Sequence, residues 1–501
     1  MTLGEVTGGV NHRISHEPRG ALPPEPRSRL MGAGAQTPRE ATLSPTRRSP
    51  TKGGRAPVRK PPSTVAMLGG VLGVRLGVML GLLAGAIAGC THSVTGLARA
   101  ETPDELRVGT SGDYAPFSQE VPGPGEAAGF RQRGFDPDLA RAYAKDRNLS
   151  LRFVPFRWPE LVADLEAGRF DVAMSGITVR PERSLAGRFS LPTASSGAVA
   201  LVPEASSLFR PDDLNRVGLR IAVNAGGHLE QTARKFFPEA TLVALQDNAG
   251  VIDALARGAT DAAISDTREA PHWQATHPGL RMVGPFTSDR KALLVAAEQA
   301  ELAHDLNVWL LARERSGRMA ALRSEHLGDP VRDETPHPAL SALLAAIAER
   351  LALMPWVAEA KRDAGSAVEV PEREARVINA ALAQVRETEE ANDIAPAQRV
   401  RAAAVRELFA AQIEAAKSIQ HAVLRRPRPP GQAPPPALDT VLRPALLRIG
   451  ERIAWLIVQL PPGIPDDVIR ARSQSQLRGL GLAEERIDDL ARGLIAVDGT
   501  L

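Results

Sequence analysis

Two cationic side chains lie in an apolar helical stretch in the second half of the chain. Arg350 and Lys361 are eleven residues apart, and at 3.6 residues per turn this spacing brings both to the same face of a helix. Their neighbours on that face are apolar, among them Ile347, Leu351 and Val357. Cations at such positions either extend their charged ends to the surface or bind an anion in a water-excluded pocket. The spacing by itself leaves both interpretations open.

A second group of polar residues follows strand-like runs in the first half of the chain. Ser175 and Thr178 follow the run 170–174, Asn224 precedes Ala-Gly-Gly, and Asp266 ends the run Asp-Ala-Ala-Ile-Ser-Asp. Joints from strand to helix that contain glycine present backbone N–H groups to an anion. In open α/β sheets, ligands bind at the carboxyl ends of the strands. These joints therefore predict a site for a small anionic ligand.

The elements that must position these residues differ between the two halves. From 104 to 328, short β-like runs alternate with helical patterns, as in an α/β fold. The predicted strands are 106–110, 151–155, 170–174, 221–223 and 261–266, and the predicted helices include 135–148 and 158–167.

After a polar linker at 329–338, the composition becomes rich in Ala, Leu and Arg, and no strand signal appears. Residues 339–501 are therefore predicted to form an all-α domain. The predicted helices are 339–364 with a kink at Pro355, 371–392 and 396–424.

Charge is distributed unevenly along the 501 residues, whose formal net charge is +3. The first 100 residues carry thirteen Lys/Arg and four Asp/Glu, whereas the other 401 carry 48 Lys/Arg and 54 Asp/Glu. The basicity belongs to the first hundred residues, and the remainder is mildly acidic. This distribution removes the main support for a nucleic-acid partner, and we predict none.

The first hundred residues resemble a leader followed by an export signal. Residues 1–66 are rich in Pro, Gly, Arg and Ser, and we expect a disordered basic leader that is removed or not translated, with Met67 as an alternative start. Residues 67–100 contain an uncharged run of signal-peptide length, and Ile-Ala-Gly-Cys ending at Cys90 resembles a lipidation site. Ala98-Arg99-Ala100 resembles an A-x-A cleavage site and is the alternative processing site. We expect a periplasmic or exported protein, with a lipid on Cys90 as the candidate contact to the membrane.

Cofactor chemistry has little support in the sequence. A single cysteine excludes an intramolecular disulfide and a cysteine-based zinc site. No metal-ligand spacing, P-loop or Ser/His/Asp arrangement stands out. We predict neither a metal nor another cofactor.

Segment 104–328 resembles the periplasmic solute-binding proteins for amino acids. The resemblance is carried by LRVGTSGDYAPF, GFDPDLARAYA, RFDVAMSGITVRPER and a later FS-x-P. It implies a two-lobed α/β domain in which Arg183 binds a ligand carboxylate through two parallel hydrogen bonds. It also implies that Ser175, Gly176 and Thr178 surround the same group.

Further matches resemble one enzymatic branch, the cyclohexadienyl dehydratases, which convert prephenate to phenylpyruvate and often arogenate to phenylalanine. In this branch the glutamate three residues after the strand-end aspartate is the general acid, a position held here by Glu269. Such a group must be a neutral carboxylic acid, since it protonates the departing ring hydroxyl. The chain departs from the branch where His228-Leu229 replace Thr-Asn and where a lysine after FS-x-P is absent. The other residues implied to contact substrate are Trp158, Asn224, Gly227, His228, Asp266 and Lys291.

The helical domain resembles the all-helical exported chorismate mutases. The resemblance is carried by Ala-Glu-Arg-Leu with a lysine eleven residues after the arginine, by Glu-Arg-Glu, and by QIEAAKSIQ. It implies carboxylate-binding arginines, a pair that donates to the ether oxygen, and a contact to the ring hydroxyl. These are, in that order, Arg350, Arg373 and Arg443, then Lys361 and Gln420, then Glu374. Ala416 departs from the serine or threonine of relatives.

Together the two resemblances predict a bifunctional exported enzyme of phenylalanine biosynthesis, because the two reactions are consecutive. Its substrates would be chorismate and prephenate, with arogenate as a further candidate, and the sequence leaves its oligomeric state open. One alternative is an amino-acid-binding protein fused to a chorismate mutase, which Glu269 would distinguish because a binder has no turnover to lose. A second alternative is a structural or sensory module with a degenerate helical domain, against which the retained cations argue.

Overall fold

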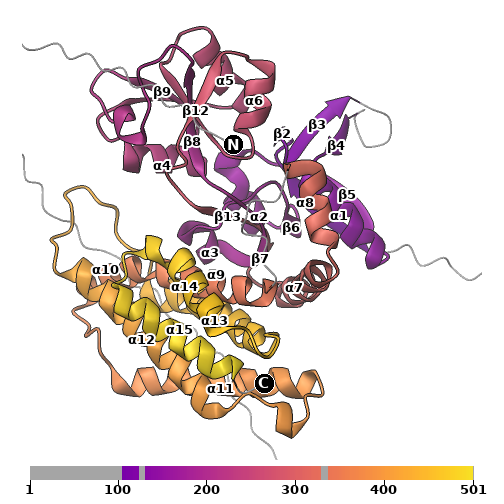
Figure 1. Cartoon of the computed structure of the whole chain (residues 1–501), viewed down its shortest axis with the longest axis vertical. Coiled ribbons are helices and arrows are strands. Elements are labelled where there is room, and N and C mark those ends of the chain that lie inside the picture. Colours follow the sequence, from indigo (N-terminus) through magenta and orange to yellow (C-terminus); the bar gives the residue numbers. More distant parts are fainter. Residues whose placement is uncertain (1–103, 123–129, 329–336, 500–501) are drawn as a thin grey trace, which may run out of the picture. The chain divides into compact units, whose positions relative to one another are not determined.

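The structure is a computed structural model, and it describes residues 104–122, 130–328 and 337–499 (Figure 1). The predicted leader, the signal segment with Cys90 and most of the linker predicted at 329–338 lie outside these residues. The described residues all belong to one compact unit, Gly96–Leu501.

The first lobe of the α/β domain is built on a five-stranded sheet in the order β5-β1-β6-β13-β7. β1 is parallel to β5 and β6, whereas β13 is antiparallel to β6 and β7. Gly109 of β1 pairs with Ala173 of β6, so the carboxyl ends of these two strands are adjacent. The strands are β1 Glu105–Thr110, β5 Ser150–Pro155, β6 Val172–Ala173, β7 Gly187–Ser196 and β13 Asp289–Ala296.

The second lobe has a sheet of the same size in the order β10-β9-β11-β8-β12. The parallel strands β9, β10 and β11 are joined to β8 and β12 through antiparallel pairs. The strands are β8 Ala198–Pro203, β9 Arg220–Asn224, β10 Thr241–Leu245, β11 Ala262–Asp266 and β12 Leu280–Val283.

The chain crosses between the lobes twice, at Gly197 and again between Val283 and Asp289. A small antiparallel sheet, β2-β3-β4, stands beside the first lobe. Its strands are β2 Asp113–Tyr114, β3 Ser118–Pro122 and β4 Phe130–Arg133.

Helices flank both sheets, and this explains why the strands read as nearly continuous apolar runs. Every residue of β11 is buried, and so are all residues of β8 except its last. The α-helices are α1 Phe135–Asp146, α2 Leu161–Glu166, α3 Pro181–Ala186, α4 His228–Phe236, α5 Asn248–Ala256, α6 Ala270–Thr276, α7 Ala300–Arg315 and α8 Arg318–Leu327. Short 3₁₀ turns lie at Trp158–Glu160 and Pro211–Leu214.

The second domain consists of helices and their connecting loops, with no strand among its described residues, 337–499. Its α-helices are α9 Pro338–Ala352, α10 Met354–Ala364, α11 Pro371–Ala391, α12 Ala402–Leu424, α13 Arg443–Val458, α14 Asp466–Leu477 and α15 Glu484–Asp498. Short 3₁₀ or π turns lie at Pro396–Gln398, Leu438–Leu442 and Arg478–Leu480. Segment Pro338–Ala364 is long and apolar enough to cross a membrane, but 78% of its most apolar window is buried inside the protein, as in a core helix.

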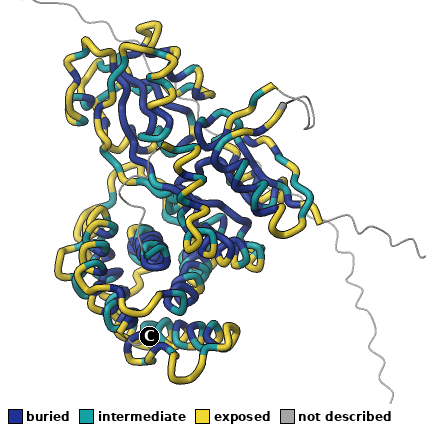
Figure 2. The backbone as a smooth tube through the Cα atoms, turned by 45° about the vertical axis from the view of Figure 1, so that its right-hand side comes forward, coloured by how far each residue is buried: buried dark blue, intermediate teal, exposed yellow. Residues whose placement is uncertain are grey.

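Buried residues follow the strands of both sheets and the inward faces of the helices (Figure 2). In α9, every residue from Leu340 to Leu351 except Ser341 is buried. A helix that is apolar around most of its circumference belongs in a core. α9 is therefore the central helix of the second domain, and Arg350 is carried on it.

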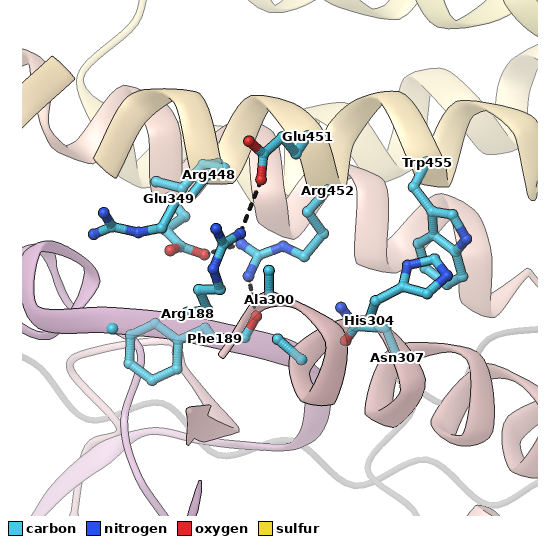
Figure 3. Close-up of a pocket in the computed structure, with 13 residues that line it drawn as sticks. Arg188, Phe189, Ala300, His304, Asn307, Glu349, Arg448, Glu451, Arg452 and Trp455 are labelled. Atoms are coloured by element: carbon cyan, nitrogen blue, oxygen red, sulfur yellow. Dashed lines mark hydrogen bonds and ion pairs between the residues drawn. The ribbon is translucent and has the colours of Figure 1, made fainter. Parts of the chain in front are cut away.

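Residues of the two domains meet around a pocket of about 200 Å³ (Figure 3). Arg188 of β7 pairs with Glu451 of α13 at 2.9 Å, and Arg452 donates to the carbonyl oxygen of Phe189. Arg452 also pairs with Glu349 of α9. None of the predicted site residues lines this pocket.

The predicted fold class, a two-lobed α/β domain followed by an all-α domain, is confirmed. Some elements differ in extent from the sequence prediction. The strand predicted at 170–174 is reduced to Val172–Ala173, and the helix predicted from 396 begins at Ala402, after a 3₁₀ turn. The predicted kink at Pro355 is the break between α9 and α10, since a proline lacks the N–H that would continue the helix.

Helices α12 and α15 approach closely at a glycine, which allows a test of their packing. A Cβ added at Gly493 of α15 would lie 2.8 Å from the Cα of Leu408 in α12. We expect Gly493→Ala to lower the free energy of unfolding by about 1–3 kcal/mol because the helices must separate. Urea unfolding followed by circular dichroism measures the effect.

A matched control is Gly450→Ala in α13, where a Cβ would meet nothing within 4 Å. Here the helix propensity of alanine should raise stability by up to about 1 kcal/mol. Equal effects of the two substitutions would contradict the packing argument.

Candidate active sites

The candidate acid of the α/β domain stands where β11 meets α6. Asp266 is the last residue of β11, and Glu269 is the residue immediately before α6. Both side chains are 1% exposed. The strand end and the helix start thus place two carboxyl groups of adjacent sequence in a water-excluded position.

Glu269 is held by two neutral donors. Its Oε1 accepts a hydrogen bond from Asn248 Nδ2 at 3.0 Å, and its Oε2 accepts one from Ser265 Oγ at 2.7 Å. Burial raises the pKa of Glu269 well above its usual value, and the nearby charge of Asp266 raises it further. Both effects favour the protonated, neutral form of the Glu269 carboxyl group.

Asp266, by contrast, is held as a carboxylate. Lys291 Nζ lies 3.2 Å from its Oδ2, and the hydroxyl of Tyr114 donates to the same oxygen. Although burial opposes ionisation, Lys291 and the hydrogen bonds keep the pKa of Asp266 below its usual value. Two carboxyl groups three residues apart therefore have pKa values shifted in opposite directions, a pattern found where acid and charge-stabilising roles are divided.

Arg183 and Lys291 converge on Thr178. Arg183 Nη1 donates to the Thr178 carbonyl at 3.0 Å, and Lys291 Nζ donates to Thr178 Oγ1 at 2.9 Å. Arg183 is 2% exposed, its Nε has no partner among the described residues, and burial lowers its pKa to about 9. The Arg183 guanidinium lies 5.8 Å from the ring of Trp158, whose Nε1 donates to Asp113 Oδ1 at 3.2 Å.

Ser175 and Gly176 form the loop after β6, and both are already engaged. Ser175 Oγ accepts from the N–H of Ser111 at 3.1 Å. The N–H of Gly176 donates to Asp136, and a Cβ at Gly176 would lie 2.6 Å from the Tyr114 ring. Its φ of +62° also requires glycine. These two residues hold the loop in place, whereas the Nε–H of Arg183 is available to donate to a ligand.

Asn224, Gly227 and His228 lie on the second lobe around the joint between β9 and α4. Both amide atoms of Asn224 are buried without a partner among the described residues, and Gly227 precedes the helix. His228 Nε2 lies 3.0 Å from Asp289 Oδ2 at the crossing between the lobes. His228 lines a cleft of about 1240 Å³, and Glu269 is not among the residues that line it. The structure therefore gives His228 a contact between the lobes.

In the helical domain, all six predicted residues line one cavity of about 250 Å³. They come from five helices, and apolar side chains such as Val357 and Phe409 fill the rest of the wall. The predicted six are Arg350 on α9, Lys361 on α10, Arg373 and Glu374 on α11, Gln420 on α12 and Arg443 on α13.

The charges of this cavity are unbalanced toward positive. Burial and then the charge of Arg373 lower the pKa of Arg350 to about 10. Burial followed by the charges of Arg373 and Arg443 lowers the pKa of Lys361, whose Nζ donates to the Val368 carbonyl at 2.9 Å. Cations that lower one another's pKa values in a partly buried cavity would be stabilised by an anion bound between them.

Gln420 supplies the uncharged donor of this cavity. Its Nε2 lies 3.2 Å from the Ala416 carbonyl, and its Oε1 is buried without a partner among the described residues. Glu374 pairs with Lys417 at 3.5 Å. A second lysine of the cavity thus holds the candidate contact to a ring hydroxyl.

Sequence reasoning missed several residues at both sites. Asn248 of α5 donates a hydrogen bond to Glu269, and Lys417 and Gln384 line the cavity of the helical domain. Lys417 lies within the QIEAAKSIQ motif and could have been found there. Nothing local marks Asn248, because its contact joins segments 21 residues apart through the packing of α5 on the sheet.

The α/β site contains a buried carboxyl group of raised pKa and two cations, and the helical cavity contains cations and an amide donor. The part of the chain that the structure describes contains no group of three His, Cys, Asp or Glu side chains suited to a metal ion.

Each of the two domains matches a different family model. The family model for bacterial extracellular solute-binding proteins, family 3, matches residues 106–329, and the model for chorismate mutase type II matches residues 341–421.

Known relatives of the α/β domain include both an enzyme and binding proteins. A cyclohexadienyl dehydratase of Pseudomonas aeruginosa is 33% identical over 226 residues, covering 44% of this chain and 81% of the relative. A probable histidine-binding protein of Neisseria gonorrhoeae is 27% identical over 205 residues, covering 40% and 74%. The crystal structure of an ancestral amino acid-binding protein, described as a precursor of cyclohexadienyl dehydratase, is 31% identical over 44% of this chain and 95% of that chain, with a TM-score of 0.41.

Asp136 offers a pH test of the loop that carries Gly176. One oxygen of Asp136 accepts the Gly176 N–H, the other has no partner among the described residues, and burial raises its pKa to about 7. Between pH 4 and 7 the folded protein therefore holds a proton that the unfolded chain has lost. This group should lower the free energy of unfolding as pH rises across that window, and add no change above about pH 8.

The comparison variant is Asp136→Asn, which keeps an acceptor oxygen and does not titrate. The free energy of unfolding of the wild type minus that of the variant, measured by urea denaturation from pH 4.5 to 8.5, should fall with pH and then level off. A difference that rises with pH would contradict the raised pKa.

Proposed function

Because the chain belongs through residues 106–329 to the bacterial extracellular solute-binding proteins, family 3, and carries a type II chorismate mutase domain after them, we propose that it is an exported bifunctional enzyme of phenylalanine biosynthesis. The helical domain converts chorismate to prephenate. The α/β domain converts prephenate to phenylpyruvate. Arogenate, which has an α-amino group where prephenate has a keto group, is a second candidate substrate of the same site.

The mutase proposal is supported most directly by the convergence of six side chains from five helices on one cavity. Chorismate is a dianion, and its rearrangement is concerted, so the step requires no acid, base or cofactor. What the reaction requires is a compact substrate conformation and stabilisation of charge that develops on the ether oxygen. Arg350, Arg373 and Arg443 would bind the carboxylates, while Lys361 and Gln420 would donate to the ether oxygen.

The dehydratase proposal is supported by the environment of Glu269. In this reaction the bond between the ring and its carboxylate breaks, CO₂ leaves, and the electron pair enters the ring. The ring hydroxyl departs as water with one added proton, which leaves an aromatic ring. Glu269 is buried, has a raised pKa and is hydrogen-bonded by Asn248 and Ser265, and it would supply that proton.

Arg183 and Lys291 would hold the side-chain carboxylate of prephenate in the same site. The free Nε–H of Arg183 is a buried donor that a carboxylate would satisfy. The carboxylate that leaves as CO₂ must be held less firmly, since strong binding of that group would stabilise the ground state against its loss.

An amino-acid-binding protein fused to a mutase remains the alternative, because relatives of the α/β domain include binding proteins. The specific observation that favours an enzyme is the water-excluded position of the Glu269 carboxyl group, which is held by two neutral donors and has a raised pKa. A site that only binds an anion gains nothing from a buried neutral acid beside it, whereas proton transfer to a leaving hydroxyl requires one.

The proposal extends to the organisation of the chain. Residues 104–328 would be the dehydratase and 339–501 the mutase, joined by 329–338, so that the linker raises the local concentration of prephenate. Export would follow from the signal segment at 67–100, with Cys90 as the candidate lipid attachment site.

Supplying the purified protein with chorismate should yield phenylpyruvate. In the variant Glu269→Gln the two-step reaction should stop at prephenate. The amide keeps the shape of Glu269 and one of its two acceptor oxygens but has no acidic proton, so we expect kcat for dehydration to fall about 10²–10⁴-fold. Chromatography of the products with time measures both steps.

The reciprocal control is Lys361→Met, which should lower mutase kcat about 10²–10³-fold and leave the dehydration of added prephenate unchanged. Accumulation of prephenate by the wild type would overturn the dehydratase proposal, and unreacted chorismate would overturn both.

Gln420 predicts the pH dependence of the mutase step. An amide donates a hydrogen bond at any pH, whereas a glutamate in its place donates only when protonated. Gln420→Glu should therefore make mutase kcat fall about tenfold per pH unit above the pKa of the new carboxyl, while the wild type shows no such limb.

Gln420→Leu is the matched control, since it removes the donor without adding a titrating group and should be weakly active at every pH. A wild-type profile that falls above pH 5, and loses that fall in Gln420→Leu, would contradict this role.

A further inference from the structure

The segment that carries Arg183 lies against the helical domain. Val179 and Leu191, on either side of α3, line a small cavity together with Ala342 and Ala346 of α9. The helix α3 itself contacts both α9 and α13. The backbone that holds the candidate carboxylate-binding arginine is therefore supported in part from outside its own domain.

The carboxyl end of α3 is capped by a side chain of α13. Arg448 Nη2 donates to the Leu185 carbonyl at 2.9 Å and to the Ser184 carbonyl at 3.3 Å. The last carbonyl groups of a helix have no partner within the helix, and they form the negative end of its dipole. A cation at this position thus satisfies both the hydrogen-bonding groups and the charge of the helix end.

The strand that follows α3 is held by the same helix of the second domain. Arg188 of β7 pairs with Glu451 at 2.9 Å, and Arg452 donates to the Phe189 carbonyl (Figure 3). Glu451 and Arg452 lie within one turn of Arg448 on α13. One helix of the second domain therefore contacts both α3 and the first residues of β7.

The position of Arg183 depends on the position of α3, because its side chain is enclosed. It is 2% exposed, its Nη1 donates to the Thr178 carbonyl at 3.0 Å, and its guanidinium lies 5.8 Å from the ring of Trp158. Its Nε is a buried donor without a partner among the described residues. If α3 moved, the packed side chain would have little room to compensate, so the Nε–H would move with the helix.

We propose that Arg448 of the helical domain is a positioning residue of the α/β site: by capping α3 it holds Arg183 where a ligand carboxylate binds. Ligand binding by the α/β domain then depends on the domain to which it is fused. The inference rests on the proposed function for the carboxylate-binding role of Arg183. Arg448 is not among the residues that line the cavity of the helical domain, so the mutase step does not require it.

Steady-state kinetics of the full chain with added prephenate test this role. We expect Arg448→Met to raise KM for prephenate at least about tenfold, since a small misplacement of a binding group has effects of this size. The fall in kcat should be smaller, because Glu269 lies on the other lobe. Arg448→Lys keeps the charge and should recover part of the loss. An unchanged KM in a folded Arg448→Met would overturn the inference.

The mutase step and a second contact between the domains provide the controls. Arg448→Met should leave kcat/KM for chorismate within about twofold of the wild type. Arg315 of α7 donates to the Gln459 carbonyl at 2.8 Å, a contact between the domains that does not involve α3. Arg315→Met should therefore leave KM for prephenate unchanged. An equal rise of KM in Arg315→Met and Arg448→Met would reduce the effect to docking of the domains and overturn the specific role of Arg448.

A double-mutant cycle tests whether Arg448 acts through Arg183. Once Arg183→Met has removed the carboxylate-binding group, adding Arg448→Met should raise KM by less than about twofold further, because the two changes affect one interaction. A further rise as large as that in the single variant would show that Arg448 acts by another route, against the proposal.

Hydrogen exchange of the ligand-free chain separates this inference from the proposed function. Deuterium uptake by segment 181–189 should be faster in Arg448→Met than in the wild type, because loss of the cap allows the end of α3 to open, and Arg315→Met should match the wild type. Unchanged uptake in Arg448→Met would overturn the positioning role, whatever the α/β domain binds. Faster uptake in a chain whose wild type does not turn over prephenate would support the positioning role and overturn the dehydratase proposal instead.

Discussion

Burial of positive charge is the constraint on which both candidate sites depend. Arg183 is 2% exposed and donates to a backbone carbonyl, and Arg350 is 9% exposed beside the charge of Arg373. Removing such groups from water costs several kcal/mol each unless an opposite charge compensates. Under the proposed function an anionic substrate would supply that compensation, so that binding would offset the free-energy cost of the buried cations. The folds around them must be rigid enough to hold the cations there.

The two domains meet this requirement in different ways. In the α/β domain, strand ends and short loops place the groups, and Asp266 fixes Lys291 from the opposite lobe. In the helical domain, five separate helices each contribute one or two residues to a cavity whose remaining walls are apolar. The first arrangement separates an acid from a carboxylate by giving them different partners, which suits proton transfer. The second provides fixed donors with no strong acid or base, which suits a pericyclic rearrangement under the proposed function.

Contacts between the domains lie close to both sites. Arg448 of α13 donates to the carbonyl of Leu185 at 2.9 Å, two residues after Arg183, and α13 begins with Arg443. Arg452, one turn further along α13, pairs with Glu349, the neighbour of Arg350. One helix thus touches elements that carry cations of each site, so the packing of α13 affects the position of both. The joint between the domains is therefore part of the framework that holds the sites.

The sequence pattern was sufficient to predict those features that depend on residues close to one another in the sequence. The spacing of Arg350 and Lys361, the strand ending at Asp266 and the glycine-containing loop at Gly176 could all be predicted, because helical and strand periodicity act over a few residues. The sequence by itself thus determined the order of the elements, the two fold classes and, through resemblance, the six residues of the helical cavity. Only the tertiary structure decided that Asn248 holds Glu269, that His228 pairs with Asp289, and that Tyr114 and Lys291 both contact Asp266. Those contacts join residues from 21 to 152 positions apart, and their partners are set by how sheets, helices and lobes pack, which no local spacing encodes.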